Sequence, residues 1–150
     1  MRFEHLNIAR SETGSSLVEM ALFLPVLFLL LMGVVDFGRA YYLANEVAGA
    51  VHAGAVYGSQ DITDTTGMQS AASLNAPDVS GLSTSASWGC ECSDGTSRSA
   101  SCTATPTCSV NEVYYATVTA TATYKPIVPW TGVHSSIIIT RSATMRSASE

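Results

Sequence analysis

An uncharged apolar run near the N-terminus constrains this chain more than any other feature. Residues 20–35 read MALFLPVLFLLLMGVV, with Glu19 directly before them and Asp36 directly after them. A helix over residues 15–37 would be about 34 Å long, enough to cross a hydrocarbon core of about 30 Å. The alternative is a buried helix in a soluble protein, but only about 90 residues, rich in Ser, Thr and Gly, remain to cover it. We therefore expect one membrane span.

The remaining composition argues against several functions. Of 150 residues, 47% are apolar and 13% are charged, which is too apolar for a disordered chain. Twelve acidic and seven basic residues give a net charge of −5, and without a basic cluster nucleic acid is not expected as a partner. The histidines His5, His52 and His134 have no nucleophile or second metal ligand in a suggestive position. We expect no enzyme activity, no cofactor and no metal.

The cysteines indicate the compartment. Cys90, Cys92, Cys102 and Cys108 lie close together in a segment that is poor in large apolar side chains. This density is typical of a small domain stabilised by disulfides in an oxidising compartment. We therefore predict a cytoplasmic N-terminus, a single span in the inner (cytoplasmic) membrane, and a C-terminal domain that is periplasmic or extracellular.

Two disulfides are the simplest use of these four cysteines. Of the three possible connectivities we favour Cys90 with Cys108 and Cys92 with Cys102, nested across a hairpin. Loops of this size stabilise a fold by about 3 kcal/mol each if loop-closure entropy dominates. A four-cysteine zinc site is the alternative, but the spacing C-x-C followed by gaps of nine and five residues differs from that of zinc knuckles.

Glu19 is a carboxylate at the entrance of an apolar helix, a position that requires a partner or a purpose. One interpretation is a capping box formed by Ser16 and Glu19, with Gly14 as a turn residue before the helix. The other is cleavage between Gly14 and Ser15, which would place Glu19 one helical turn from a new amino group. The residues alone leave both interpretations open.

The stretch ETGSSLVEMALFLPVLFLLLMGVVDFGRAYY resembles the N-terminus of TadE-like pseudopilins of the tight-adherence (Tad/Flp, type IVb-related) pilus system. The end of the chain, from Tyr115 through YKPIVPW to SSIIITRSATMR, resembles the closing strands of the same family. The resemblance implies that Gly14 ends a leader peptide, that Ser15 is the mature N-terminus, and that Glu19 serves in processing and assembly. The chain departs from the family at Met20, where the processing motif usually has an aromatic residue.

The resemblance also implies a function and partners. The function would be that of a minor pilin or pseudopilin in the assembly or initiation of a Tad pilus involved in adhesion. Its partners would be a prepilin peptidase, other pilins and pseudopilins of the system, an inner-membrane assembly platform, and membrane lipid. The alternative is an uncleaved bitopic anchor that displays a disulfide-stapled extracytoplasmic binding module. A secretory signal peptide is a further alternative, since small-x-small sequences occur at 48–50 and 53–55.

Helix-forming residues continue past the apolar run, so we predict one long helix over residues 16–57, with Pro25 tolerated inside it. Small residues recur at intervals of four in its second half and would allow close packing, against either another subunit or the chain's own sheet. These residues form two sets, Ala40, Ala44 and Ala48 in the first and Gly54 and Gly58 in the second.

The C-terminal part predicts a short helix and an antiparallel sheet. A helix is expected at 68–74 and a strand at 82–88, and the alternation of Thr with apolar residues predicts a half-exposed strand at 113–124. Residues 137–145 are its expected partner strand. The predicted fold class is α+β and pilin-like, with a long N-terminal helix packed on a small antiparallel sheet. The expected organisation is a leader (1–14), a transmembrane helix (15–37), its continuation (38–58), and an exported domain (59–150) with a disulfide-rich loop (88–110).

Overall fold

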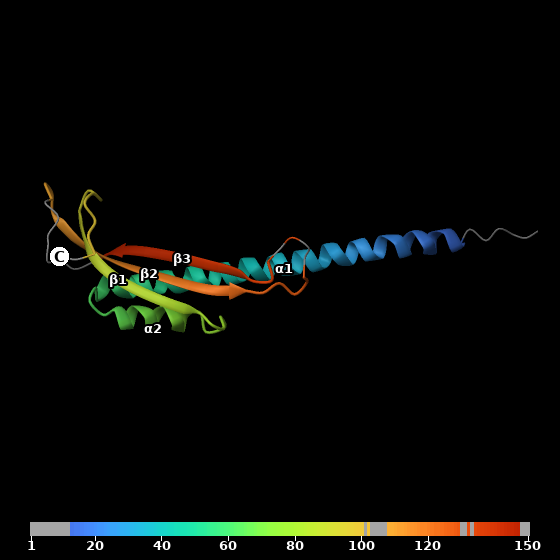
Figure 1. The fold of residues 1–150 in the computed structure, drawn as a ribbon, viewed down its shortest axis with the longest axis horizontal. Coiled ribbons are helices and arrows are strands. Elements are labelled where there is room, and N and C mark those ends of the chain that lie inside the picture. The colour runs from blue at the N-terminus through green and yellow to red at the C-terminus, as the bar shows by residue number, and fades with distance from the viewer. Residues whose placement is uncertain (1–12, 101, 103–107, 130–131, 133, 148–150) are drawn as a thin grey trace, which may run out of the picture. The chain divides into compact units, whose positions relative to one another are not determined.

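The fold is α+β, as predicted. The computed structural model describes residues 13–100, 102, 108–129, 132 and 134–147. In chain order its elements are α1 (Thr13–Gln60), α2 (Thr65–Asn75), β1 (Ser83–Cys92), β2 (Glu112–Tyr124) and β3 (Ile137–Arg146) (Figure 1). The chain divides into two compact units, Met1–Phe37 and Gly38–Glu150. Most of the predicted leader lies outside the described residues.

Helix α1 confirms the long helix predicted from the sequence. It is 48 residues long and extends three residues beyond the predicted 16–57 at each end. Pro25 lies inside it, at a place where an apolar helix can absorb the missing backbone hydrogen bond.

The sheet has β2 at its centre, with β1 and β3 antiparallel on either side. The pairing of β2 with β3 runs from Tyr115 opposite Arg146 to Tyr124 opposite Ile137, which confirms the predicted pair. Strand β1 continues four residues past the predicted 82–88, because Cys90 and Cys92 pair with the first residues of β2. Both cysteines therefore lie within a strand.

One face of the sheet consists of hydroxyl side chains. The register places three Ser of β1, three Thr of β2 and three Ser/Thr of β3 side by side, which are Ser83, Ser85, Ser87, Thr117, Thr119, Thr121, Thr140, Ser142 and Thr144. Hydroxyls of β2 and β3 hydrogen bond across the strands, at 2.9 Å between Thr117 and Thr144 and 3.1 Å between Thr119 and Ser142. The period of two in the sequence thus correctly predicts a polar face.

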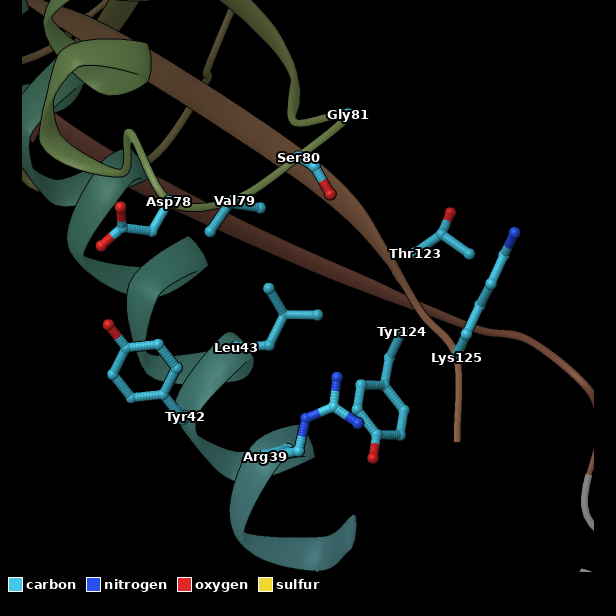
Figure 2. A pocket seen from close by; sticks show the side chains of 10 residues that line it. All are labelled: Arg39, Tyr42, Leu43, Asp78, Val79, Ser80, Gly81, Thr123, Tyr124 and Lys125. Carbon is cyan, nitrogen blue, oxygen red and sulfur yellow. The ribbon is translucent and has the colours of Figure 1, made fainter. Parts of the chain in front are cut away.

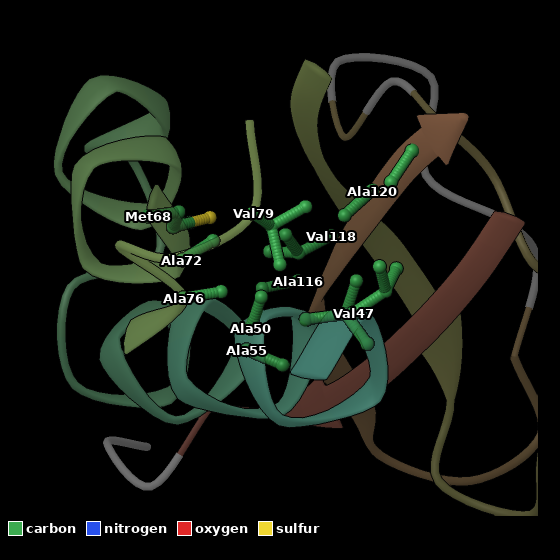
Figure 3. Close-up of a cluster of buried hydrophobic side chains, with 12 residues drawn as sticks. Val47, Ala50, Ala55, Met68, Ala72, Ala76, Val79, Ala116, Val118 and Ala120 are labelled. Atoms are coloured by element: carbon green, nitrogen blue, oxygen red, sulfur yellow. The ribbon is translucent and has the colours of Figure 1, made fainter. Parts of the chain in front are cut away.

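The other face of the sheet carries the hydrophobic core. In the unit Gly38–Glu150, the second half of α1 and helix α2 pack against small residues of β2 (Figure 3). The buried side chains include Val47, Ala50, Val51, Ala55, Met68, Ala72, Ala116, Val118, Ala120 and Ala122. Because most of these residues are Ala or Val, the layers approach closely and the core is thin.

Two glycines of α1 make this close approach possible. A Cβ atom on Gly54 would lie 2.7 Å from the backbone oxygen of Met68 and 3.0 Å from Val118 Cγ1. A Cβ atom on Gly58 would lie 2.6 Å from Ala116 Cβ. These two small residues therefore pack against the chain's own sheet and α2, which is the second of the two alternatives raised by the sequence.

Helix α2 is held by a cap at its N-terminus. It begins three residues before the predicted 68–74 and ends, as predicted, before Pro77. The Asp64 carboxylate accepts hydrogen bonds of 2.8 Å from the Gly67 amide and 2.8 Å from the Tyr57 hydroxyl. The hydrogen bond from the Gly67 amide contributes most to lowering the pKa of Asp64, and the bond from the Tyr57 hydroxyl contributes next. A lowered pKa is expected for a carboxylate at a helix N-cap.

Candidate functional site

The first half of α1 is an apolar helix with its side chains exposed. From Ser16 onward α1 is long and apolar enough to cross a membrane, with a mean hydropathy of 2.5 in its most apolar window. The large apolar side chains of this half of the helix are exposed on all its sides, among them Leu17 (73% exposed), Phe23 (72%) and Val34 (69%). So large a contiguous apolar surface is not stable in water, and it requires lipid or neighbouring protein as its environment.

The predicted processing residues lie in the first turns of this helix. Gly14 and Glu19 are both exposed on α1, and the side chain of Ser15 lies outside the described part of the structure. Because α1 begins at Thr13, Ser16 and Glu19 are inside the helix, and Ser16 does not precede it as a capping residue must. The capping-box interpretation is therefore wrong, as is that of Gly14 as a turn before the helix.

The four cysteines form two disulfides, but not with the predicted pairing. The structure joins Cys90 to Cys102 and Cys92 to Cys108, with Cα–Cα distances of 5.6 Å and 5.5 Å. The nested pairing of Cys90 with Cys108 and Cys92 with Cys102 is wrong. As expected for a C-x-C in extended chain, Cys90 and Cys92 lie on the same side of β1.

The return of the chain after β1 explains this pairing. Cys90 and Ser99 exchange two backbone hydrogen bonds, of 2.9 Å and 2.8 Å. Cys102 follows three residues later and is thus the cysteine that comes within reach of Cys90. On the other side, Cys92 pairs with Glu112 in the sheet, and the chain approaching Glu112 brings Cys108 with it.

Between the two cysteines, Glu91 points to the opposite face and forms a buried ion cluster that the sequence reasoning missed. Its side chain is 2% exposed. Oε2 accepts a hydrogen bond of 2.7 Å from Arg98 Nε, and Oε1 accepts one of 2.8 Å from Arg146 Nε. The guanidinium group of Arg98 also lies 4.5 Å from the ring centre of Tyr115. The cluster ties the disulfide-rich loop to the end of β3.

The ionised form of Glu91 is favoured in this cluster. Burial by itself raises the pKa of the carboxyl group, but the hydrogen bonds from Arg146 and Arg98 and their positive charges outweigh it, so that the pKa is lowered. The sequence does not signal this role. Strand alternation places Glu91 on the face opposite the cysteines, the same face as the Ser side chains of β1, where a carboxylate would be expected to be solvated and not buried.

Within the described residues, few side chains are arranged in a way that could bind a metal or carry out acid–base chemistry. Ligand atoms of Cys90, Cys102 and Glu112 lie within 4.8 Å of one another, but the two sulfur atoms are bonded to each other and provide no thiolate. His52 lies exposed on α1, and His134 lies exposed shortly before β3. His5 lies outside the described residues.

Comparison with known families supports the resemblance seen in the sequence. Residues 14–56 match the family model described as TadE-like protein. The match begins at Gly14, the predicted last residue of the leader, and covers the exposed apolar part of α1 and most of its continuation. Comparisons with curated proteins and with solved structures found no match. Over residues 14–56, which are less than half of the chain, the sequence is therefore similar to the TadE-like family, and this match is consistent with a protein of the Tad pilus system.

Proposed function

We propose that the chain is a minor pilin or pseudopilin of a Tad pilus, made as a membrane-anchored precursor and used in pilus assembly or initiation. In this role it is a structural subunit and not a catalyst. The single observation that carries the proposal is the TadE-like match at residues 14–56, over a helix whose apolar side chains are exposed. Lipid would cover this surface before assembly, and neighbouring pilin helices would cover it afterwards.

A prepilin peptidase would cleave between Gly14 and Ser15. Gly14 is exposed in the first turn of α1, and a Cβ placed on it would have no described atom within 4 Å. Cleavage would place the new amino group of Ser15 one turn from Glu19. Their opposite charges would offset the cost of bringing either group into an apolar filament core.

The two disulfides support the export of the domain that follows. Disulfides persist in an oxidising compartment and are rare in the cytosol. The membrane topology that fits is an N-terminus in the cytoplasm, one span in the inner membrane, and the Gly38–Glu150 unit outside it. The proposed partners are the peptidase, other pilins and pseudopilins, and the inner-membrane assembly platform.

N-terminal sequencing of the native protein tests this proposal. The mature chain should begin SSLVEM, and Gly14→Val should leave the precursor uncut because a branched side chain obstructs access to the scissile bond. Gly38→Val is the matched control, since Gly38 is also a helical glycine with open space around it, and this variant should be cut normally. An untrimmed wild-type chain would instead indicate the uncleaved bitopic anchor.

Glu19→Ala tests the role of the carboxylate. We expect this variant to insert into the membrane at the wild-type level and to fail in processing or in pilus incorporation. Glu46→Ala, a change of the same kind farther along α1, is the control. If Glu19→Ala gives normal processing and normal amounts of the chain in isolated pili, Glu19 has no part in either step.

A further inference from the structure

The outer edge of β1 is open over the first half of the strand. Cys90 donates its backbone N–H away from β2, to the carbonyl oxygen of Ser99. Every second residue of a strand points its N–H and C=O groups to the same side, so the preceding even-numbered residues also point these groups outward. They are Thr84, Ala86 and Trp88. Among the residues that the structure describes, no backbone group pairs with them on that side, and such an edge is a template for another strand.

Helix α2 packs beside β1 and leaves a hollow of about 470 Å³ next to this edge. Its lining comes from one side of α2 and one residue of β1, and consists of Thr66, Gln69, Ser70, Ser73, Leu74 and Thr84. All of these are polar except Leu74, which is 80% exposed. A hollow between a helix and an open strand edge suits an extended segment that adds a strand to the sheet.

Strand β3 has an open edge of its own. Ser147 donates its N–H toward β2, to Tyr114, so by the same alternation the even-numbered residues of β3 point their backbone groups outward. No residue of β3 is buried, and Ile138 is 70% exposed. Because β1 and β3 are both antiparallel to β2, they run in the same direction. Two copies in the same orientation would therefore bring β3 of one beside β1 of the other as parallel strands.

The register of the sheet indicates which residues would meet. Ser83 and Thr140 both pair with Thr121, so they lie at the same level of the sheet. A second copy placed at this level would bring its Thr140 beside Ser83, and its Arg141 beside Thr84. Thr84 is the β1 residue that lines the hollow, so Arg141 of the second copy would arrive there.

Arg141 is a charge on the face of the sheet that carries the helices. It pairs with the buried core residue Ala120, and its side chain is exposed. A charge that points to this face at a sheet edge normally discourages pairing with another strand. The hollow instead offers a guanidinium group the side-chain oxygens of Gln69, Ser70 and Ser73 as acceptors. The edge of β3 is thus suited to this hollow in particular.

The two edges also differ in charge. No Lys or Arg occurs from residue 40 to residue 97, whereas Asp61 and Asp64 precede α2 and Asp78 follows it. Figure 2 shows a second hollow, with Lys125 across it from Asp78, so this lysine does not offset that carboxylate. Strand β3 carries two arginines and no acidic residue. The basic strand therefore complements the acidic side of the sheet.

We propose that the hollow between α2 and β1 receives β3 of a second copy in the same orientation, which adds to β1 as a fourth, parallel strand. The contact is heterologous, because the β1 side of one copy meets the β3 side of the next, and it can repeat along a row of copies. This inference rests on the proposed function for the common orientation of the copies, and it names the surface through which such pilus subunits contact each other. It does not depend on cleavage after Gly14.

A labelled peptide of residues 136–147 tests whether the hollow binds β3. Its fluorescence anisotropy should rise on titration with the full chain in mild detergent, and the same peptide with Arg141→Glu should bind about tenfold more weakly. In the chain, Ser70→Trp fills the hollow from an exposed position of α2 and should weaken binding of the wild-type peptide by about the same factor. Ser85→Trp is the matched control, since Ser85 is exposed on the hydroxyl face of β1, and should bind as the wild type does.

Two proline variants test the backbone pairing. Thr84→Pro removes an outward N–H of β1 and no hydrogen bond to β2, and should weaken peptide binding by about fivefold. Ser142→Pro makes the same change at the outer edge of the chain's own β3 and should leave binding unchanged. Where circular dichroism shows that a proline variant has lost its sheet, the two tryptophan variants decide.

Mixing two variants tests whether the contact is heterologous. Sedimentation velocity of the full chain in detergent should show self-association that is lost in Ser70→Trp and in Arg141→Glu, beyond any association through the apolar helix that all variants share. An equal mixture of these two variants should form dimers and no larger rows. One variant keeps the strand and the other keeps the hollow, so a single contact remains.

Three results would overturn the proposal. They are a wild-type chain that does not bind the peptide, equal losses in Ser70→Trp and Ser85→Trp, or a mixture that associates no more than its components. N-terminal sequencing separates this failure from that of the proposed function. A chain that begins SSLVEM but does not bind the peptide refutes the strand contact alone, whereas an untrimmed chain that binds it refutes the pilin proposal alone.

Discussion

Replacing Glu91 with Gln tests whether the buried ion cluster holds the disulfide-rich loop on the sheet. Glutamine keeps the shape of the side chain but removes the negative charge that faces Arg98 and Arg146. A hydrogen bond to a charged group contributes about 1.5–3 kcal/mol and a neutral one about 0.5–1.5 kcal/mol. Two such bonds are weakened, but both arginines are about half exposed (52% and 49%) and water recovers part of the loss. We expect the free energy of unfolding to fall by about 1–3 kcal/mol.

The pH dependence gives this prediction a second part. Because the pKa of Glu91 is lowered from its ordinary value of 4.5 in the folded protein, its contribution is fully present above that value. It is lost as the pH falls through the lower, folded-state pKa. The difference in unfolding free energy between the wild type and Glu91→Gln should therefore be constant near neutral pH and shrink below about pH 4.5.

Urea unfolding of the full chain in detergent, followed by tryptophan fluorescence, measures both effects. Trp88 lies on β1 with its ring centre 6.4 Å from that of Tyr114, so its emission reports on this part of the sheet. Glu112→Gln on the neighbouring strand is the matched control and should change the unfolding free energy by less than about 0.5 kcal/mol. Equal stability of wild type and Glu91→Gln at pH 7, or an equal loss in Glu112→Gln, would refute the reasoning.

Two further predictions concern packing and connectivity. Gly54→Ala should lower the unfolding free energy by about 1–2 kcal/mol, because contact with the backbone oxygen of Met68 outweighs the gain in helix propensity. The control Gly38→Ala has open space and should be neutral or stabilising, and a neutral Gly54→Ala would contradict the close packing. For the disulfides, thiol titration of unfolded protein should find no free thiol in Cys90→Ser/Cys102→Ser, since Cys92–Cys108 remains. The same titration should find two free thiols in Cys90→Ser/Cys108→Ser. Two free thiols in the first variant and none in the second would instead support the nested pairing.

The periodic features of the chain could be predicted from its sequence. The apolar run and the helix formers that follow it predict α1, and the alternation of Thr with small apolar residues predicts β2 and its polar face. These signals are local, because each periodic pattern lies within the residues that form the helix or strand. The N-terminal end of α1 is an exception, because the Ser16–Glu19 pattern fits a cap although the helix begins at Thr13.

Contacts between distant residues could not be predicted in the same way. Glu91 and Arg146 are 55 positions apart, and their meeting depends on the register of all three strands. The disulfide pairing depends on two backbone hydrogen bonds between Cys90 and Ser99, which no spacing of cysteines reveals. For the candidate site, Gly14, Ser15 and Glu19 stay predictions as processing residues, whereas the charges of the Glu91 cluster come from three separate segments of the chain.

The interleaved disulfides bear on how the domain would mature if it is exported as proposed. Translocation that starts just after the membrane span would bring Cys90 and Cys92 to the oxidising side before Cys102 and Cys108. Oxidation in order of appearance would join Cys90 to Cys92, whereas the folded domain joins each of them to a later cysteine. Native pairing therefore requires either that oxidation waits for the whole loop to be translocated or that a first, wrong bond is exchanged. The supply of an oxidant alone therefore does not determine the yield of the correctly bridged chain, since thiol–disulfide exchange can also be required.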